Sequence, residues 1–290
     1  MPSPVLRFAP SPNGRLHLGH AYSALLNAAF AAEMRGRLLL RLEDIDPLRC
    51  RPDLAAAVID DLSWLGLSFE APVRRQSEHM ADYRAVLDGL RERGLAYPCF
   101  CSRRAVAAAA SGSDPDGAPL YPGTCRGRPD AGALIAAGHP HAWRLDGEAA
   151  RAQARDGLAV TVFAAPGATS VRPAAPARWG DAVIARKDVP TSYHLAVVWD
   201  DAVQGVSHVV RGRDLDAATD LHVLLQALLG LPGPAYHHHA LIRDPAGEKL
   251  SKSLGSVALA ALRREGVTAP EVWRRLGFRP GPGGAPILIR

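Results

Sequence analysis

The 290-residue sequence contains few of the residues that mark specialised classes of protein. It has four cysteines and only 6% aromatic residues. Four cysteines in a chain this long do not form the disulfide framework of a small secreted domain. No apolar run reaches the roughly 18–20 residues that span a bilayer, and the N-terminus lacks the pattern of a signal peptide. We therefore expect a reduced, cytoplasmic protein with no membrane segment.

A large excess of one charge is also missing. Lys+Arg 34 and Asp+Glu 29 leave a net charge of +5, carried almost entirely by arginine. This mild excess is compatible with a polyanionic partner such as nucleic acid, and equally with solvated helix faces. The 48% hydrophobic and 22% charged residues are ordinary for a globular protein, which excludes wholesale disorder, collagen and coiled coil.

The hydrophobic pattern predicts an α/β fold. Residues 5–9 and 38–42 read as short buried strands, and residues 19–35 between them have helical spacing. Strand, helix and strand form the opening of a βαβ unit, and hence of a parallel sheet covered by helices. Further helices are expected at 54–67, 80–93, 217–229, 257–264 and 271–276, strands at 142–145 and 159–163, a His-rich strand within 236–256, and a frayed tail at 281–284.

A change of composition indicates an insertion in this fold. From residue 97 to about residue 176 the chain is rich in Cys, Gly, Pro and Ala and has only short strand candidates. We expect residues 1–96 to form the first half of an α/β domain, residues 97–176 an inserted subdomain, and residues 177–290 the second half with a short helical C-terminus.

The first candidate site lies at residues 10–20, between the first strand and the first helix. An open α/β sheet presents helix N–H groups to an anion at this place. His17 and His20 are three residues apart, so one helical turn can direct both imidazoles toward a phosphate group. Gly19 has no side chain and would let a base or ribose approach the backbone. Taken alone, two histidines near a helix start are more often structural or surface residues.

The second candidate site is the polar loop at residues 248–255, with the sequence Glu-Lys-Leu-Ser-Lys-Ser-Leu-Gly. Its lysines supply charge and its serines supply directed hydrogen bonds, so the loop could fold over a polyphosphate. By itself an exposed polar loop is the simpler interpretation.

Together, the H-x-G-H pattern at 17–20 and the K-x-S-K-S pattern at 249–253 resemble the HIGH and KMSKS motifs of class I aminoacyl-tRNA synthetases. Leu250 replaces the usual methionine, which is a volume-conserving exchange. Residues 7–14, 41–46, 193–201 and 205–212 resemble glutamyl-tRNA synthetases, but the chain ends about 35 residues after the lysine loop, without their helical anticodon-binding region. It is therefore similar to the glutamyl-queuosine tRNA(Asp) synthetase family.

This resemblance implies a Rossmann-type catalytic domain with an inserted zinc-containing subdomain. It also implies ATP-dependent activation of L-glutamate without tRNA, Mg²⁺ bound with ATP, and transfer of glutamate to the queuosine base at the wobble position of tRNA(Asp). The implied catalytic residues are His17, His20 and Lys252. The implied ATP-binding residues are His17, Gly19, His20, Lys249, Ser251, Lys252 and Ser253, and the implied glutamate-binding residues are Arg7, Phe8, Ala9, Pro10, Ser11, Glu43, Tyr193 and Arg211.

Elementary chemistry agrees with such a pocket. Glutamate has two carboxylates and one ammonium, and burying any of them unpaired is costly. Arginines suit the carboxylates and an acid suits the ammonium. By resemblance, Arg7 and Arg211 contact carboxylate, Glu43 accepts from the α-amino group, Ser11 closes the rim, and Tyr193 supplies a hydroxyl and a wall. Alternatively, Arg7 and Glu43 could simply pair with each other across neighbouring strands.

A third group is Cys99, Cys101 and Cys125, whose spacing suggests a structural zinc site. Three thiolates are not four ligands. The family pattern C-x-C…Y-x-x-x-C makes Tyr121 the fourth ligand by resemblance, although water or a histidine could substitute, and metal-free thiols are the plain alternative. Cys50 is expected to be an ordinary thiol.

The run His237-His238-His239 is expected to be structural. Consecutive strand residues point to alternate faces, so at most two of these imidazoles could share an ion. His208 and His222 receive no assignment.

Two other functions remain open: a minimal glutamyl-tRNA synthetase that charges a tRNA 3′ end, and a non-catalytic regulator derived from a synthetase. The presence of His17, His20, Lys249 and Lys252 beside a full glutamate pocket argues against the regulator. We expect the protein to be a monomer.

Overall fold

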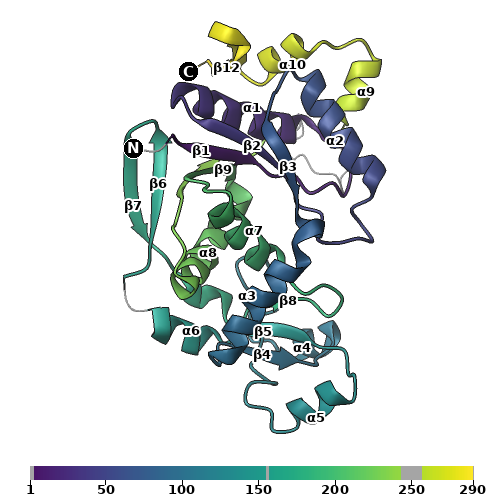
Figure 1. Cartoon of the computed structure of the whole chain (residues 1–290), viewed down its shortest axis with the longest axis vertical. Helices are drawn as coiled ribbons and strands as arrows, with labels where there is room; N and C mark the ends of the chain where they lie inside the picture. Colours follow the sequence, from purple (N-terminus) through teal and green to yellow (C-terminus); the bar gives the residue numbers. More distant parts are fainter. Residues whose placement is uncertain (1–2, 155–156, 243–256, 290) are drawn as a thin grey trace.

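A computed structural model of the chain describes residues 3–154, 157–242 and 257–289. Its largest sheet has seven strands in the spatial order β3-β2-β1-β9-β10-β6-β7 (Figure 1). Neighbouring strands are parallel from β3 to β6, and the edge strand β7 is antiparallel to β6. The predicted α/β class is confirmed. The strands are β1 (Val5–Phe8), β2 (Arg37–Leu42), β3 (Glu70–Arg75), β6 (Ala159–Ala165), β7 (Ala168–Pro173), β9 (His208–Gly212) and β10 (Ala235–His239).

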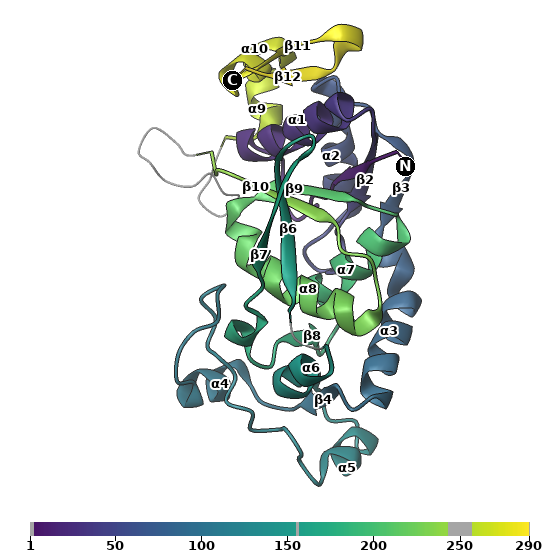
Figure 2. The same ribbon diagram turned by 90° about the vertical axis from the view of Figure 1, so that its left-hand side faces the viewer.

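Helices cover both faces of this sheet (Figures 1 and 2). Strand side chains alternate between the faces, so Leu6 and Phe8 of β1 join the core beneath α1 (Leu18–Glu33) and α2 (Pro52–Trp64). Val5 lies in a separate cluster with Val209 of β9, against Val223 of α8 (Asp216–Leu229). The parallel β1–α1–β2 unit that the sequence predicts is confirmed.

Residues 278–288 form regular structure, so the prediction of a frayed tail at 281–284 was wrong. Strands β11 (Phe278–Pro280) and β12 (Pro286–Leu288) form an antiparallel ribbon, and η4 (Pro282–Gly284) lies between them. Phe278 is 1% exposed, and its ring lies 5.6 Å from that of Tyr22 on α1. The glycines are therefore the turn of a ribbon that packs on α1. Helices α9 (Leu259–Arg264) and α10 (Ala269–Arg275) precede it.

A second, three-stranded sheet lies at the opposite end of the molecule, with the order β4-β5-β8 (Figure 1). Helix α3 (Met80–Glu92) leads to it. That residues 97–176 form one inserted subdomain stays a prediction. Strands β6 and β7 lie within that range and belong to the main sheet, whereas β8 lies beyond it and pairs with β5. The elements here are β4 (Ala96–Cys99), α4 (Arg103–Ala109), α5 (Ala131–Ala136), β5 (Ala142–Leu145), α6 (Gly147–Ala154), η2 (Pro176–Trp179) and β8 (Val183–Ala185).

The order of the main sheet determines where a ligand can bind. The chain passes from β1 outward to β2 and then to β3. The other strands of this sheet lie on the opposite side of β1, where β9 is the immediate neighbour of β1. Parallel strands end at one edge, and the crevice where the strand order reverses is the usual ligand site of such sheets. Here that crevice lies beyond Phe8 of β1 and Gly212 of β9. Helix α7 (Tyr193–Val203) approaches the same edge.

Candidate active site

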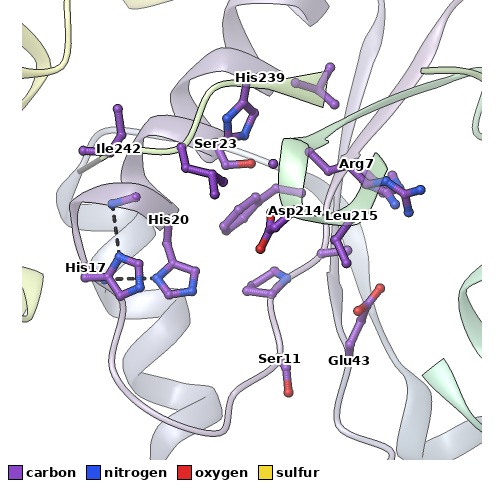
Figure 3. A pocket seen from close by; sticks show the side chains of 18 of the residues that line it. Arg7, Ser11, His17, His20, Ser23, Glu43, Asp214, Leu215, His239 and Ile242 are labelled. Carbon is purple, nitrogen blue, oxygen red and sulfur yellow. Dashed lines mark hydrogen bonds between the residues drawn. The ribbon is translucent and has the colours of Figure 1, made fainter. Parts of the chain in front are cut away.

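A cavity of about 790 Å³ lies at this edge of the sheet (Figure 3). The loop after β1, the start of α1, and the ends of β2, β9 and β10 surround it. Each of the predicted glutamate-binding residues lines it, as do three of the predicted ATP-binding residues. They are Arg7, Phe8, Ala9, Pro10, Ser11, Glu43, Tyr193 and Arg211 in the first group, and His17, Gly19 and His20 in the second.

The lysine loop lies outside the described residues. Lys249, Ser251, Lys252 and Ser253 therefore keep the assignment that the sequence gives them, without a structural description. Other residues that line the cavity were not predicted, among them Asn13, Ser23, Arg49, Asp214, Leu215 and His239.

His17 and His20 lie side by side at the start of α1, with ring centroids 3.8 Å apart. The Gly19 N–H donates to His17 Nδ1 at 3.1 Å, and the His17 N–H donates to His20 Nδ1 at 3.2 Å (Figure 3). A neutral imidazole that accepts at Nδ1 carries its proton on Nε2. Both rings are thus fixed as Nε2–H donors at a helix N-terminus, where anions are favoured.

Arg7 and Glu43 belong to a buried ionic network rather than a simple pair. Arg7 Nε lies 3.0 Å from Asp201 Oδ1, and Arg41 Nη1 lies 2.7 Å from the same oxygen. Arg41 Nη2 also lies 3.2 Å from Glu43 Oε1. Asp200 precedes Asp201 on α7, and its Oδ1 accepts a hydrogen bond from Arg74 Nε at 2.8 Å. The network therefore joins β1 and β2 to α7.

The balance of burial and neighbouring charge shifts the pKa values of two carboxyl groups of this network in opposite directions. Although burial alone would raise it, Arg7 and Arg41 hold the pKa of Asp201 below its usual value. Burial raises the pKa of Glu43 against the lowering influence of Arg41 and Arg7. Asp201 is therefore the fixed counter-charge of the arginines, and Glu43 is the carboxylate whose charged form would gain most from a cationic ligand.

Arg211 is held differently. It is 5% exposed, and its Nη2–H donates to Thr219 Oγ1 at 2.7 Å while Nη1–H donates to the Tyr193 hydroxyl at 3.4 Å. Burial raises the pKa of Tyr193 to about 12, so this hydroxyl stays protonated. Within the described parts of the chain, Arg211 has no carboxylate at ion-pairing distance. A buried guanidinium of this kind favours an anionic ligand.

Asp200, Asp201 and Thr219 support the site and were not predicted from the sequence. Two adjacent acids that follow the apolar run 195–199 of helix α7 are a signal that could have found the first two. Thr219 gives no such signal, since a threonine on a helix is ordinary.

The predicted sulfur ligands also lie together. Cys99, Cys101 and Cys125 have their sulfurs within 4.8 Å of one another, and Cys101 Sγ is 3.6 Å from Cys125 Sγ. Tetrahedral zinc with Zn–S bonds of about 2.3 Å separates its sulfurs by about 3.8 Å, so the cluster could hold a metal. Although burial alone would raise it, hydrogen bonds from Tyr121, the Phe100 N–H and the other thiols lower the pKa of Cys125 to about 7. The Tyr121 hydroxyl lies 3.7 Å from Cys101 Sγ.

Comparisons with known proteins point to one class. A family model described as "tRNA synthetases class I (E and Q), catalytic domain" matches residues 5–280. Crystal structures of a glutamate tRNA ligase from Elizabethkingia meningosepticum and of glutamate-tRNA synthetase from Elizabethkingia anophelis have TM-scores of 0.65 and 0.69 at 22% and 23% identity. Each matches 99% of this chain, which spans 57% and 58% of those proteins. The fold is that of a class I tRNA synthetase catalytic domain.

Relatives with higher sequence identity indicate the family within this class. The "Glutamyl-Q tRNA(Asp) synthetase" of Rhodobacter capsulatus is 48% identical over 94% of this chain and 100% of its own length. That of Symbiobacterium thermophilum is 40% identical over 98% of this chain and 88% of its own length. The chain belongs to the glutamyl-Q tRNA(Asp) synthetase family of class I synthetases, which are ligases. Among the described helices, none has the length and apolar character needed to cross a membrane.

An imidazole pair lies behind the cavity. His194 Nδ1 is 3.2 Å from His222 Nε2, a geometry in which one nitrogen donates and the other accepts. Burial, together with the charge of Arg211, lowers the pKa of His194 to about 4 and that of His222 well below its usual value. Both imidazoles are therefore neutral in the folded protein near neutral pH.

We expect the free energy of unfolding to fall as the pH drops below about 6.5, the pKa of histidine in an unfolded chain. Below that pH the unfolded imidazoles bind protons that the folded ones do not, so this contribution is complete above about 6.5 and is lost toward acid. Each such histidine adds about 1.4 kcal/mol per pH unit to the slope of the free energy of unfolding against pH. Urea denaturation between about pH 7 and pH 5 measures it.

The variant His194→Asn is the matched comparison, since it keeps an acceptor near the Nδ1 position and removes one titrating group. Its slope should be smaller by about 1.4 kcal/mol per pH unit. The comparison also cancels the effect of Asp61, whose pKa burial raises to about 6. Equal slopes in the two proteins would contradict a neutral His194.

Proposed function

We propose that the chain activates L-glutamate with ATP, forms glutamyl-adenylate without tRNA, and transfers the glutamate to the queuosine base at the wobble position of tRNA(Asp). One observation carries this proposal: Arg7, Glu43 and Arg211 line the same cavity as His17 and His20. Arg7 and Glu43 lie at one side and the two imidazoles at the other (Figure 3). The cavity thus combines groups suited to an acidic amino acid with donors suited to a phosphate.

In the first step an oxygen of the glutamate α-carboxylate attacks the α-phosphorus of ATP. A P–O bond forms, the bond from that phosphorus to the bridging oxygen breaks, and pyrophosphate leaves with the electron pair. The Nε2–H groups of His17 and His20 donate to the α-phosphate oxygens as charge develops there. Positioning and charge account for most of the catalysis. Mg²⁺, bound with ATP, would supply further charge neutralisation at the phosphates.

Lys252 is the third proposed catalytic residue, and Lys249, Ser251 and Ser253 are proposed to bind phosphate with it. These four residues rest on the sequence motif alone. Gly19 would admit the nucleoside close to the backbone, because it has no side chain.

The proposed glutamate contacts follow from charge. Arg211 would take a carboxylate with the Tyr193 hydroxyl beside it, and Arg7 would add a second guanidinium contact. Glu43 would accept from the α-ammonium. Ser11 and residues 8–10 would form the wall and rim around the amino acid. Glutamine would fit less well, since its amide N–H groups would face guanidinium donors.

We infer the acceptor from the names of the relatives. Proteins 48% and 40% identical to it are called glutamyl-Q tRNA(Asp) synthetases. A protein that acts on the wobble base needs the anticodon loop, not the 3′ end, in its cleft. We further propose that the protein acts as a monomer in the cytoplasm, since one copy of the chain carries all the residues proposed here for glutamate activation.

Glutamate-dependent exchange of pyrophosphate into ATP tests the activation step. The protein should catalyse it without tRNA, and Lys252→Ala should abolish it. Arg211→Gln should lower kcat/KM for glutamate by roughly 100-fold, about 3 kcal/mol, because a charged hydrogen bond is lost. Gly89→Ala, on α3 with open space around its Cα, serves as the control and should match the parent. Exchange that is absent, or indifferent to Lys252→Ala, would disprove the mechanism.

Charging of different tRNA substrates tests the acceptor. Transfer of labelled glutamate should require queuosine in tRNA(Asp) and should persist when the 3′-terminal adenosine is removed. The reverse dependence would identify a minimal glutamyl-tRNA synthetase that esterifies the 3′ end.

We propose that the metal of the sulfur cluster is structural zinc, held by Cys99, Cys101, Cys125 and Tyr121. The purified protein should contain about one zinc per chain, and Cys125→Ser should lose it and unfold at lower temperature. Tyr121→Phe should retain zinc less firmly, as measured by competition with a chromogenic chelator. Glutamate activation should persist in the variants below their melting temperatures. A full-length protein that is stable and free of zinc after growth in zinc would refute this site.

A further inference from the structure

Arg7 and Arg211 line the same cavity, but they differ in their partners: in the described part of the chain Arg7 pairs with a carboxylate, whereas Arg211 donates to uncharged groups. Arg7 is matched by the carboxylate of Asp201, with Nε at 3.0 Å from Oδ1. Arg211 donates to neutral acceptors: besides Thr219 and Tyr193, its Nη1 lies 3.3 Å from His222 Nδ1 and its Nε lies 3.4 Å from His238 Nε2. Four of the five N–H donors of a guanidinium are thus used by uncharged groups.

The hydrogen-bond geometry defines the protonation of both imidazoles. Arginine offers only donors, so His222 Nδ1 and His238 Nε2 have to be unprotonated acceptors. The proton of His222 then lies on Nε2, which faces His194 Nδ1 at 3.2 Å. The proton of His238 lies on Nδ1, 3.2 Å from Asp216 Oδ1. Each histidine is therefore oriented by a second partner on the side away from Arg211.

The surroundings keep these rings uncharged. His222 is 2% exposed, and the side chain of His238 is 9% exposed. Burial and the charge of Arg211 lower the pKa of both imidazoles, that of His238 to about 3. Thr219 completes the arrangement: its hydroxyl oxygen accepts from Arg211 and lies 2.9 Å from His238 Nε2.

We propose that His222 and His238 are positioning residues for L-glutamate, whose neutral imidazoles hold the Arg211 guanidinium in place and leave its charge for a carboxylate of the ligand. This inference rests on the proposed glutamate activation. A carboxylate in the place of either imidazole would hold Arg211 at least as firmly, but it would also neutralise Arg211 and compete with glutamate. The orientation of the Arg211 guanidinium and the availability of its charge can therefore be separated by experiment.

The isosteric variants His222→Asn and His222→Asp make that separation. The amide oxygen of Asn replaces the Nδ1 acceptor without charge, so KM for glutamate should stay within about 3-fold of the parent. Asp adds a charge next to Arg211, and KM for glutamate should rise by about 30-fold or more, with KM for ATP and kcat at saturating glutamate changed by less than about 3-fold. Pyrophosphate exchange measures all three values.

The control is His237→Asn, which replaces the neighbouring histidine of β10. His237 points to the other face, where its Nδ1 lies 2.9 Å from the Phe163 carbonyl oxygen and its ring packs on Phe30. This variant should leave KM for glutamate unchanged. If His222→Asp does not fold, as judged by its thermal melt, the pair His238→Gln and His238→Glu repeats the comparison at Nε2.

Equal glutamate KM values for the Asn and Asp variants, whether raised or unchanged, would overturn the proposal, because only charge distinguishes the two side chains. Calorimetric binding of L-glutamate without ATP separates this inference from the proposed reaction. Binding that the Asp variant loses and the Asn variant keeps supports the inference even if the parent catalyses no exchange. A parent protein that binds no glutamate would overturn both.

Discussion

The candidate site depends on two adjacent acids in helix α7. Asp201 accepts from Arg7 of β1 and Arg41 of β2, while Asp200 accepts from Arg74 and from the Tyr83 hydroxyl. Arg41 is fully buried, so loss of its carboxylate partners would leave an uncompensated charge in the interior. These pairs hold α7 against the strand ends. Because α7 also begins with a cavity residue, the network couples the sheet to the wall of the pocket.

Charge balance connects this network to ligand choice. Arg7 and Arg41 pair with the carboxylates of Asp201 and Glu43, whereas Arg211 has no carboxylate at ion-pairing distance among the described residues, so its positive charge is in excess. Free glutamate carries two carboxylates and one ammonium, a net charge of −1, and would neutralise it. Glutamine carries no net charge and would leave the excess in place. The proposed choice of glutamate over glutamine would therefore depend on the whole set of charges, in which the neutral neighbours of Arg211 preserve the excess.

The sequence predicts what depends on local pattern and on sheet geometry. Alternation and helical spacing predict the β1–α1–β2 unit, and parallel strands that share an edge explain why residues as distant as Arg7 and Arg211 line one cavity. Pairing across 194 residues, as between Arg7 and Asp201, has no local signature. The order of the C-terminal glycines has no local signature, because their turn joins two strands that pair with each other and Phe278 of this ribbon is buried in the core with α1. His222 received no assignment, since a histidine on a helix does not reveal which nitrogen accepts.

The sulfur cluster follows a different physical requirement from the cavity. It lies with the small sheet, at the end of the molecule opposite α1 (Figure 2). Its buried cluster is small and consists of Cys99, Val106, Tyr121 and Cys125, with Tyr97, Phe100 and Cys101 packed against them. A metal bound there would supply folding energy that this core lacks. For the proposed binding of glutamate, the cavity would instead need an excess of positive charge that protein groups hold in place but do not neutralise. A metal cross-link needs polar side chains that neutralise the charge of the ion, whereas the cavity needs polar side chains that leave a charge unpaired. These opposite requirements are a physical reason for the two sites to lie in separate parts of the fold.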